Sequence, residues 1–179
     1  KELIIPEKVD INGKEYTVVK ITGTTEKKEF ESVALPNSLI EIGNVAFYKC
    51  EWLKEIKIPN SVKSIGDWAF SYCTNLQTVI IPDSVKRIGD WAFYGCSSLQ
   101  TINIPNSVES IGHEAFADCS SIKKINIPNS VESIGDWTFY GCSSLQTVII
   151  PNSVESIGNG TFYRCSSLQT VNIPNSVKS

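Results

Sequence analysis

Hydrophobic and polar positions repeat along this chain with a fixed period of 23 residues, which prolines mark from Pro36 to Pro174. Each unit follows approximately the pattern P-N-S-V-x-S-I-G-x-x-A-F-x-x-C-x-x-L-x-x-I-x-I. The Val, Ile, Ala, Phe, Cys and Leu positions are apolar, and most of the positions between them are polar. Self-similarity at this length is typical of a solenoid, because a single coil is stable only when its neighbours cover its apolar side chains.

The last part of each unit predicts a short β-strand. In the segment L-Q-T-V-I-I, Leu76, Val79 and Ile81 have the spacing L-x-x-L-x-L, which points these three side chains inward. The equivalent segments of successive units should stack into a parallel sheet. Pro82 then ends the strand, since proline has no N–H to donate.

The rest of each unit predicts a second extended piece and a short helical turn. In one unit, Val62 and Ile65 point inward, and the glycine that follows permits a tight bend. Asp67 is suited to cap a helical turn that places Ala69 and Cys73 on one buried face. We expect an α/β repeat: a right-handed solenoid of 23-residue coils, with a parallel β-sheet on the concave face and short helical turns and extended segments on the other side.

The composition does not change along the chain, which predicts a single solenoid domain over residues 1–179. Residues 36–173 hold six 23-residue repeats, and residues 174–179 begin a truncated seventh. Residues 1–35 are interpreted as a divergent N-terminal capping coil. Within that coil, Asn12-Gly13 predicts a hairpin turn, and residues 22–29 lack the Ala-Phe and Cys of the repeats.

Charge and hydrophobicity exclude two classes of partner. The net charge is −3 and no block is basic enough to follow a phosphate backbone, so nucleic acid is not expected. The longest apolar stretches, such as Val79 to Pro82, are four residues long, which excludes membrane insertion. The chain starts at Lys1 without a signal peptide, so we interpret it as a piece of a longer protein.

Residues typical of catalysis do not form a repeated pattern. His113 is the only histidine and occupies a turn position, which favours a surface residue. The six cysteines recur every 23 residues with parallel Cα–Cβ vectors, which favours buried thiols over disulfides or metal ligands. The paired serines have no repeated base beside them. We therefore expect no enzyme activity, catalytic residue, metal or cofactor.

The repeat resembles a known family. The segment Ile127 to Pro151, I-P-N-S-V-E-S-I-G-D-W-T-F-Y-G-C-S-S-L-Q-T-V-I-I-P, is similar to the leucine-rich repeat of the BspA type, also called the Treponema pallidum type. The resemblance extends from Pro36 to Ser179. It implies a secreted or cell-surface protein of a host-associated bacterium or a protist parasite, with adhesion to host or matrix proteins. It carries no ligand residues over, because the shared motif is structural.

Outward-facing positions are the candidates for a binding surface. Strand alternation aims two exposed columns toward the concave side. These candidate residues are Thr78, Ile80, Thr101, Asn103, Lys124, Asn126, Thr147, Ile149, Thr170 and Asn172. Such a lattice suits a protein surface or a glycan, and it is also what any exposed strand tolerates.

A second candidate is an aromatic strip along the predicted helical turns. It contains Trp68, Trp91, Trp137, Tyr94 and Tyr140. Aromatic residues are enriched at binding sites, but rings in neighbouring coils can equally stack to shield the core. The unit at Pro105 departs most from the pattern, with His113-Glu114 and Ile122-Lys123-Lys124. This departure fits either sequence drift or a specific contact.

We therefore predict a non-enzymatic extracellular binding or adhesion module that recognises a host or matrix protein. The alternatives are a carbohydrate-binding surface that uses Trp68 and Trp91, and a passive spacer in a larger surface protein. The last complete strand, near Val171 to Ile173, should present an open edge. We therefore also expect either self-association through the C-terminal end or a gain in stability when further repeats are appended.

Overall fold

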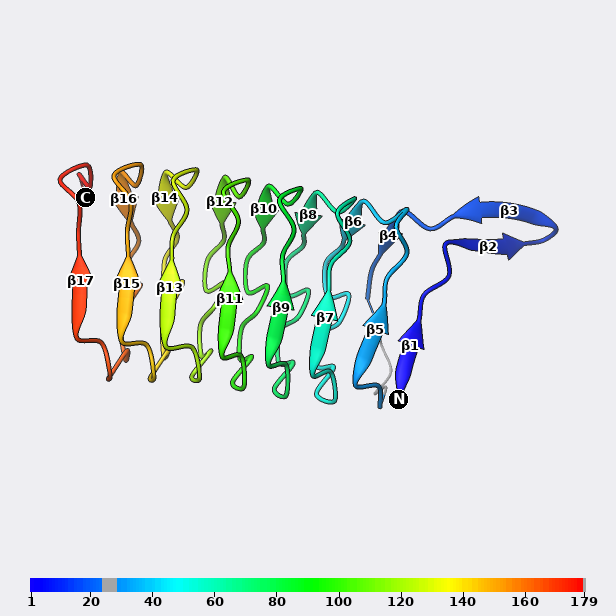
Figure 1. Cartoon of the computed structure of the whole chain (residues 1–179), viewed down its shortest axis with the longest axis horizontal. Helices are drawn as coiled ribbons and strands as arrows, with labels where there is room; N and C mark the ends of the chain where they lie inside the picture. Colours follow the sequence, from blue (N-terminus) through cyan, green and yellow to red (C-terminus); the bar gives the residue numbers. More distant parts are fainter. Residues whose placement is uncertain (24–28, 179) are drawn as a thin grey trace.

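The computed structural model describes residues 1–23 and 29–178. Residue 179 and the part of the predicted capping coil at 24–28 lie outside the described residues. The chain winds into a row of stacked coils, with its two termini toward opposite ends of the row (Figure 1). Each coil contributes one strand to each of two parallel arrays, which enclose a continuous apolar core.

The first array consists of three-residue strands. It contains β1 (Glu2–Ile4), β5 (Ser32–Ala34), β7 (Glu55–Lys57), β9 (Thr78–Ile80) and β11 (Thr101–Asn103), followed by β13 (Lys124–Asn126), β15 (Thr147–Ile149) and β17 (Thr170–Asn172). From β7 to β15 the middle residue of each strand is buried and the two flanking residues are exposed. This alternation confirms the inward and outward assignment made from the sequence.

The second array, here called the second sheet, lies on another side of the coils (Figure 1). Its strands are β4 (Lys20–Ile21), β6 (Glu41–Ile42), β8 (Ser64–Ile65), β10 (Arg87–Ile88), β12 (Ser110–Ile111), β14 (Ser133–Ile134) and β16 (Ser156–Ile157), all paired in parallel. The isoleucines of β6 to β14 are buried, as the repeat pattern predicts.

An antiparallel hairpin of β2 (Lys8–Ile11) and β3 (Lys14–Thr17) projects from the N-terminal coil (Figure 1). Asn12 and Gly13 form its turn with φ of 56° and 77°. Both residue types tolerate positive φ, so the hairpin predicted at Asn12-Gly13 is confirmed.

The remaining side of each coil is not the predicted helical turn, and the described residues contain no helix. Trp68 and Tyr72 both have φ of 58°, in the left-handed region, which interrupts any run of right-handed residues. The backbone N of Trp68 donates to the O of Asp90 in the next coil at 2.9 Å, and that of Phe70 donates to the O of Ala92 at 2.7 Å. Hydrogen bonds between coils therefore replace the bonds of a helix.

Asp67 consequently has a different role from the predicted helix cap. Its Oδ1 accepts a hydrogen bond from the backbone N of Asp90 in the next coil at 3.0 Å. Asn44 accepts one from the backbone N of Asp67 at 2.9 Å in the same way. The glycine before it is required by close approach rather than by a bend, because a Cβ on Gly66 would lie 2.5 Å from the Oδ1 of Asn44. Side chains at this position of four coils tie their coil to the next one in this way.

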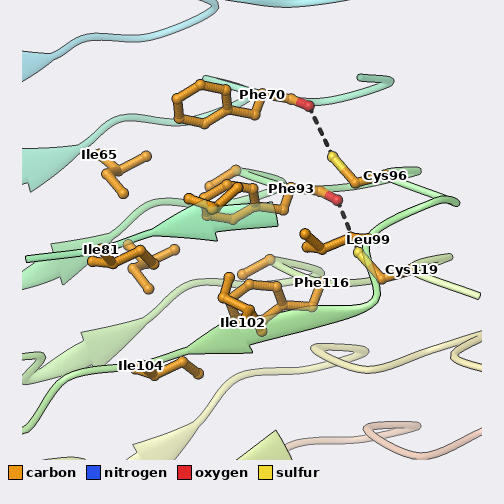
Figure 2. Close-up of a cluster of buried hydrophobic side chains, with 14 of the residues drawn as sticks. Ile65, Phe70, Ile81, Phe93, Cys96, Leu99, Ile102, Ile104, Phe116 and Cys119 are labelled. Atoms are coloured by element: carbon orange, nitrogen blue, oxygen red, sulfur yellow. Dashed lines mark hydrogen bonds between the residues drawn. The ribbon is translucent and has the colours of Figure 1, made fainter. Parts of the chain in front are cut away.

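The predicted buried columns of phenylalanine and cysteine fill the core. The rings of Phe70, Phe93 and Phe116 stack with centroids 5.2 and 5.4 Å apart (Figure 2). The Sγ of Cys96 donates to the backbone O of Phe70 in the preceding coil at 3.1 Å. The equivalent bond is made by Cys73, Cys119, Cys142 and Cys165. These thiols form no disulfides, as the parallel stacking predicts.

Candidate functional site

The strand face is defined here as the exposed side chains of the odd-numbered strands from β7 to β17. It contains all ten candidate residues predicted from the strand columns. They are Thr78, Ile80, Thr101, Asn103, Lys124, Asn126, Thr147, Ile149, Thr170 and Asn172, and each is exposed. Among the described residues, none of these side chains forms a hydrogen bond or ion pair. The face therefore presents donors, acceptors and two isoleucines on a backbone that the core holds in place.

The strand face is interrupted between β11 and β13, which belong to separate sheets. Elsewhere a backbone bond precedes each strand: Gln100 N donates to the O of Gln77 at 3.2 Å, and Gln146 N donates to the O of Lys123 at 2.9 Å. The corresponding bond from Lys123 N to Gln100 O is missing from the described residues. Two neighbouring coils are therefore not hydrogen bonded at the middle of the face.

The same separation continues around the coil into the second sheet. Only Ile111 and Ile134 are in register between β12 and β14, and no bond joins Gly135 N to Ile111 O in the described part of the chain. On the turn side the coils stay joined, because Glu114 N donates to the O of Asp136 at 3.0 Å. These two coils are therefore less closely paired at the strand face and in the second sheet, but they remain hydrogen bonded on the turn side.

His113 provides a local reason for the looser second sheet. An imidazole lacks the carboxylate oxygen with which Asp67 accepts the backbone N–H of the next coil. Its Nδ1 lies 3.9 Å from the Oδ2 of Asp136 instead. A Cβ added to Gly135 would lie 3.2 Å from the backbone N of His113. In an earlier coil, a Cβ added to Gly66 would lie only 2.7 Å from the backbone N of Asn44. The unit at Pro105, singled out from the sequence, is thus where the coils move apart.

A cavity of about 540 Å³ lies over the break in the strand face. Its lining residues are Gln100, Thr101, Ile102, Ser121, Lys123, Lys124, Asn126 and Ser144. They include two ammonium groups, several amide and hydroxyl groups, and neither a carboxylate nor an aromatic ring. A second hollow of about 250 Å³ follows the proline turns of the same pair of coils. The sequence predicted Thr101, Lys124 and Asn126 as candidate residues here, but not Lys123, Gln100 or the serines.

The predicted aromatic strip lies on the turn side. Trp68 and Trp91 stack with ring centroids 4.7 Å apart and 16° between their planes. Tyr94 is approached edge-on by Tyr72, which the sequence did not single out, at 5.2 Å. Trp137 makes similar contacts with Tyr140 and Tyr163. The strip is interrupted at Glu114 and Ala117, so it consists of two clusters whose rings contact one another.

Residues suited to catalysis or metal binding do not come together in the described chain. No group of three or more His, Cys, Asp or Glu within residues 1–23 and 29–178 could hold a metal ion. Burial raises the pKa of the Cys96 thiol to about 12, which disfavours the nucleophilic thiolate. No helix in the described residues is long and apolar enough to cross a membrane.

Comparison with known sequences identifies the repeat. Residues 24–140 and 86–179 match the BspA type leucine rich repeat region. The chain belongs to this family. A leucine-rich repeat protein of Treponema pallidum is 35% identical, with a TM-score of 0.77 over 79% of this chain and 68% of its own. No curated protein matches significantly.

Two further solved structures are similar over almost the whole chain. A leucine-rich repeat protein of Bacteroides ovatus is 29% identical, with a TM-score of 0.71 over 98% of this chain and 52% of its own. One of Eubacterium ventriosum is 27% identical, with a TM-score of 0.80 over 96% of this chain and 44% of its own. The chain therefore spans about half the length of these two relatives.

Proposed function

We propose that this BspA-type chain is a non-enzymatic binding module of a secreted or cell-surface protein, and that it recognises a host or matrix protein through its strand face. The observation that carries this proposal is the set of exposed side chains on the strand face, which form no hydrogen bond or ion pair among the described residues. Membership of the family supports the extracellular setting, as the sequence resemblance implied.

The chemistry of the strand face favours a protein partner. Ile80 and Ile149 are 56% and 49% exposed, and threonines and asparagines surround them. Apolar anchors within a polar surface are typical of protein interfaces. The buried columns hold these side chains at fixed spacing, which lowers the entropy cost of binding. The aromatic rings that a glycan would stack on are engaged with one another on the turn side.

The test is an array of host matrix and plasma proteins, probed with the chain and, in parallel, a glycan array. Ile80→Arg with Ile149→Arg places two charges on the strand face. Ser110→Arg with Ser133→Arg places the same charges on exposed positions of the second sheet. We expect the isoleucine pair to abolish capture of a protein and the serine pair to leave it unchanged. Capture that survives the isoleucine pair, or glycan binding alone, would contradict the proposal.

A further inference from the structure

The lysines at the break differ from most other lysines of the array in lacking an acidic neighbour. Four lysines elsewhere in the array pair with a glutamate at the same repeat position of the adjacent coil. Lys54 lies 2.6 Å from Glu31, and Lys86 lies 2.7 Å from Glu109. Pairing across coils thus neutralises several of the exposed lysines, although Lys57 and Lys63 also have no ion pair among the described residues.

Lys123 and Lys124 cannot be neutralised in this way. At the position of Lys123 the adjacent coils carry Gln100 and Gln146. At the position of Lys124 they carry threonines. Neither ammonium has an ion pair among the described residues. Two uncompensated positive charges therefore lie side by side at the middle of an otherwise neutral stretch of the strand face.

The break adds polar groups to this charge. Because this backbone bond is missing, the N–H of Lys123 does not donate to the C=O of Gln100. The cavity above them, about 540 Å³ in volume, is also lined by the hydroxyls of Ser121 and Ser144 and the amide of Asn126. The two charges, the missing backbone pairing and the cavity all lie where β11 meets β13. On either side of this point, β9 pairs with β11 and β13 pairs with β15.

We propose that this break is an anion site that receives an acidic segment of the protein partner. Aspartate or glutamate carboxylates of the segment bind the ammonium groups of Lys123 and Lys124. The amides and hydroxyls of the cavity and the unpaired backbone groups of the break hydrogen bond the rest of the segment. The inference rests on the proposed function and deepens it by naming the chemistry of the partner.

A peptide fits the cavity better than an acidic glycan. No aromatic ring lines it, so a sugar would find no stacking platform. A peptide main chain supplies both the donor and the acceptor that the N–H of Lys123 and the C=O of Gln100 lack. Because both lysines are exposed, the attraction should weaken as salt is raised.

The experiment measures fluorescence polarisation of a labelled ten-residue peptide of alternating Glu and Gly against the whole chain. A Gln-Gly peptide is the uncharged control, and chondroitin sulfate competes in a separate arm. Lys123→Gln with Lys124→Thr restores the residues that adjacent coils carry, so this variant should fold at least as well. Lys14→Gln with Lys63→Gln removes two exposed charges that have no ion pair and lie away from the strand face, as a matched control. Urea unfolding of each variant verifies its fold.

We expect Lys123→Gln with Lys124→Thr to weaken binding of the Glu-Gly peptide about tenfold or more. The control pair should change binding less than about twofold. The proposal would be overturned if the two variant pairs bound the Glu-Gly peptide equally, or if the parent chain bound the Gln-Gly peptide as well as the Glu-Gly peptide. It would also be overturned if chondroitin sulfate bound more strongly than the Glu-Gly peptide and depended on the same lysines.

The same variants separate this proposal from the proposed function. If a protein captured on the array is lost with Ile80→Arg and Ile149→Arg but kept with Lys123→Gln and Lys124→Thr, the strand face binds and the acidic-segment proposal is wrong. If neither pair affects capture, the proposed function is wrong as well.

Discussion

The backbone N of Val45 donates a hydrogen bond to the O of Asp67 in the next coil, 2.9 Å away. To make this bond Val45 adopts a φ of 54°, which is unusual for a β-branched residue. Its equivalents Trp68, Trp91 and Trp137 also have positive φ, and the last repeat has Gly160 at the same position. Backbone pairing between coils thus outweighs local conformational preference on the turn side.

Val45→Gly should therefore be more stable than Val45→Ala by about 1 kcal/mol, because only glycine adopts positive φ without strain. In the helical turn expected from the sequence, the order would be reversed by a similar amount. Urea unfolding of the two variants measures the difference. A more stable alanine variant would show that the left-handed conformation of this turn is incorrect.

His113→Asn should stabilise the chain by about 1 kcal/mol. Asparagine supplies an oxygen for the backbone N–H of Asp136, as Asn44 does for Asp67 at 2.9 Å. His113→Ala is the control, because it removes the imidazole without adding an acceptor. Thermal or urea unfolding that ranks the alanine variant equal to the asparagine variant would contradict the role assigned to these side chains.

Phe116→Ala should cost about 3 to 5 kcal/mol, because Phe116 is fully buried and stacked on both sides. Phe162→Ala should cost less, since Phe162 is only partly buried and stacks on Phe139 alone among the described rings. Urea titration of the two variants makes the comparison. Equal losses would mean that the phenylalanine column is not continuously packed.

Stability should fall at alkaline pH because of the thiols. Burial raises the pKa of Cys96 to about 12 and that of Cys119 well above its ordinary value of 9.0. A thiol with a raised pKa in the folded state stabilises that state fully below the unfolded pKa. This stabilisation is lost as pH rises from about 9 toward the folded pKa, where only the unfolded chain releases the protons.

Cys96→Ala with Cys119→Ala should therefore reduce the slope of unfolding free energy against pH. The reduction should be about 1.4 kcal/mol per pH unit for each thiol removed, between roughly pH 9.5 and 11. Urea unfolding across this range compares the variant with the parent chain. Identical slopes would show that these thiols are accessible in the folded state.

The core was predictable from sequence because its period is a direct consequence of stacking. Val79, Phe70 and Cys73 recur at fixed positions, and burial of their copies in all but the last coil follows from one argument. The conformation of the turn was not predictable in the same way. Asp67 is a typical helix cap and Ala69 and Cys73 have helical spacing, and only the glycines at Gly95, Gly141 and Gly160 hint at positive φ.

The break between β11 and β13 was only partly predictable. The departure of the Pro105 unit was visible in the sequence, and His113 explains the missing side-chain bond to Asp136. The separation of Lys123 from Gln100 depends on how neighbouring coils settle against each other, which no single residue type determines. Lys123 was therefore missed as a member of the cavity, although its neighbour Lys124 was included.

Cross-linking measures whether the partner contacts the strand face. A photoreactive phenylalanine analogue placed at Thr101 or Thr147, and separately at Ser133 in the second sheet, tests it most directly in the presence of a protein captured on the array. All three positions are exposed strand residues, so each substitution should be tolerated. We expect cross-links to the partner from Thr101 and Thr147 and none from Ser133. Cross-links from Ser133 with none from the two threonines would contradict it.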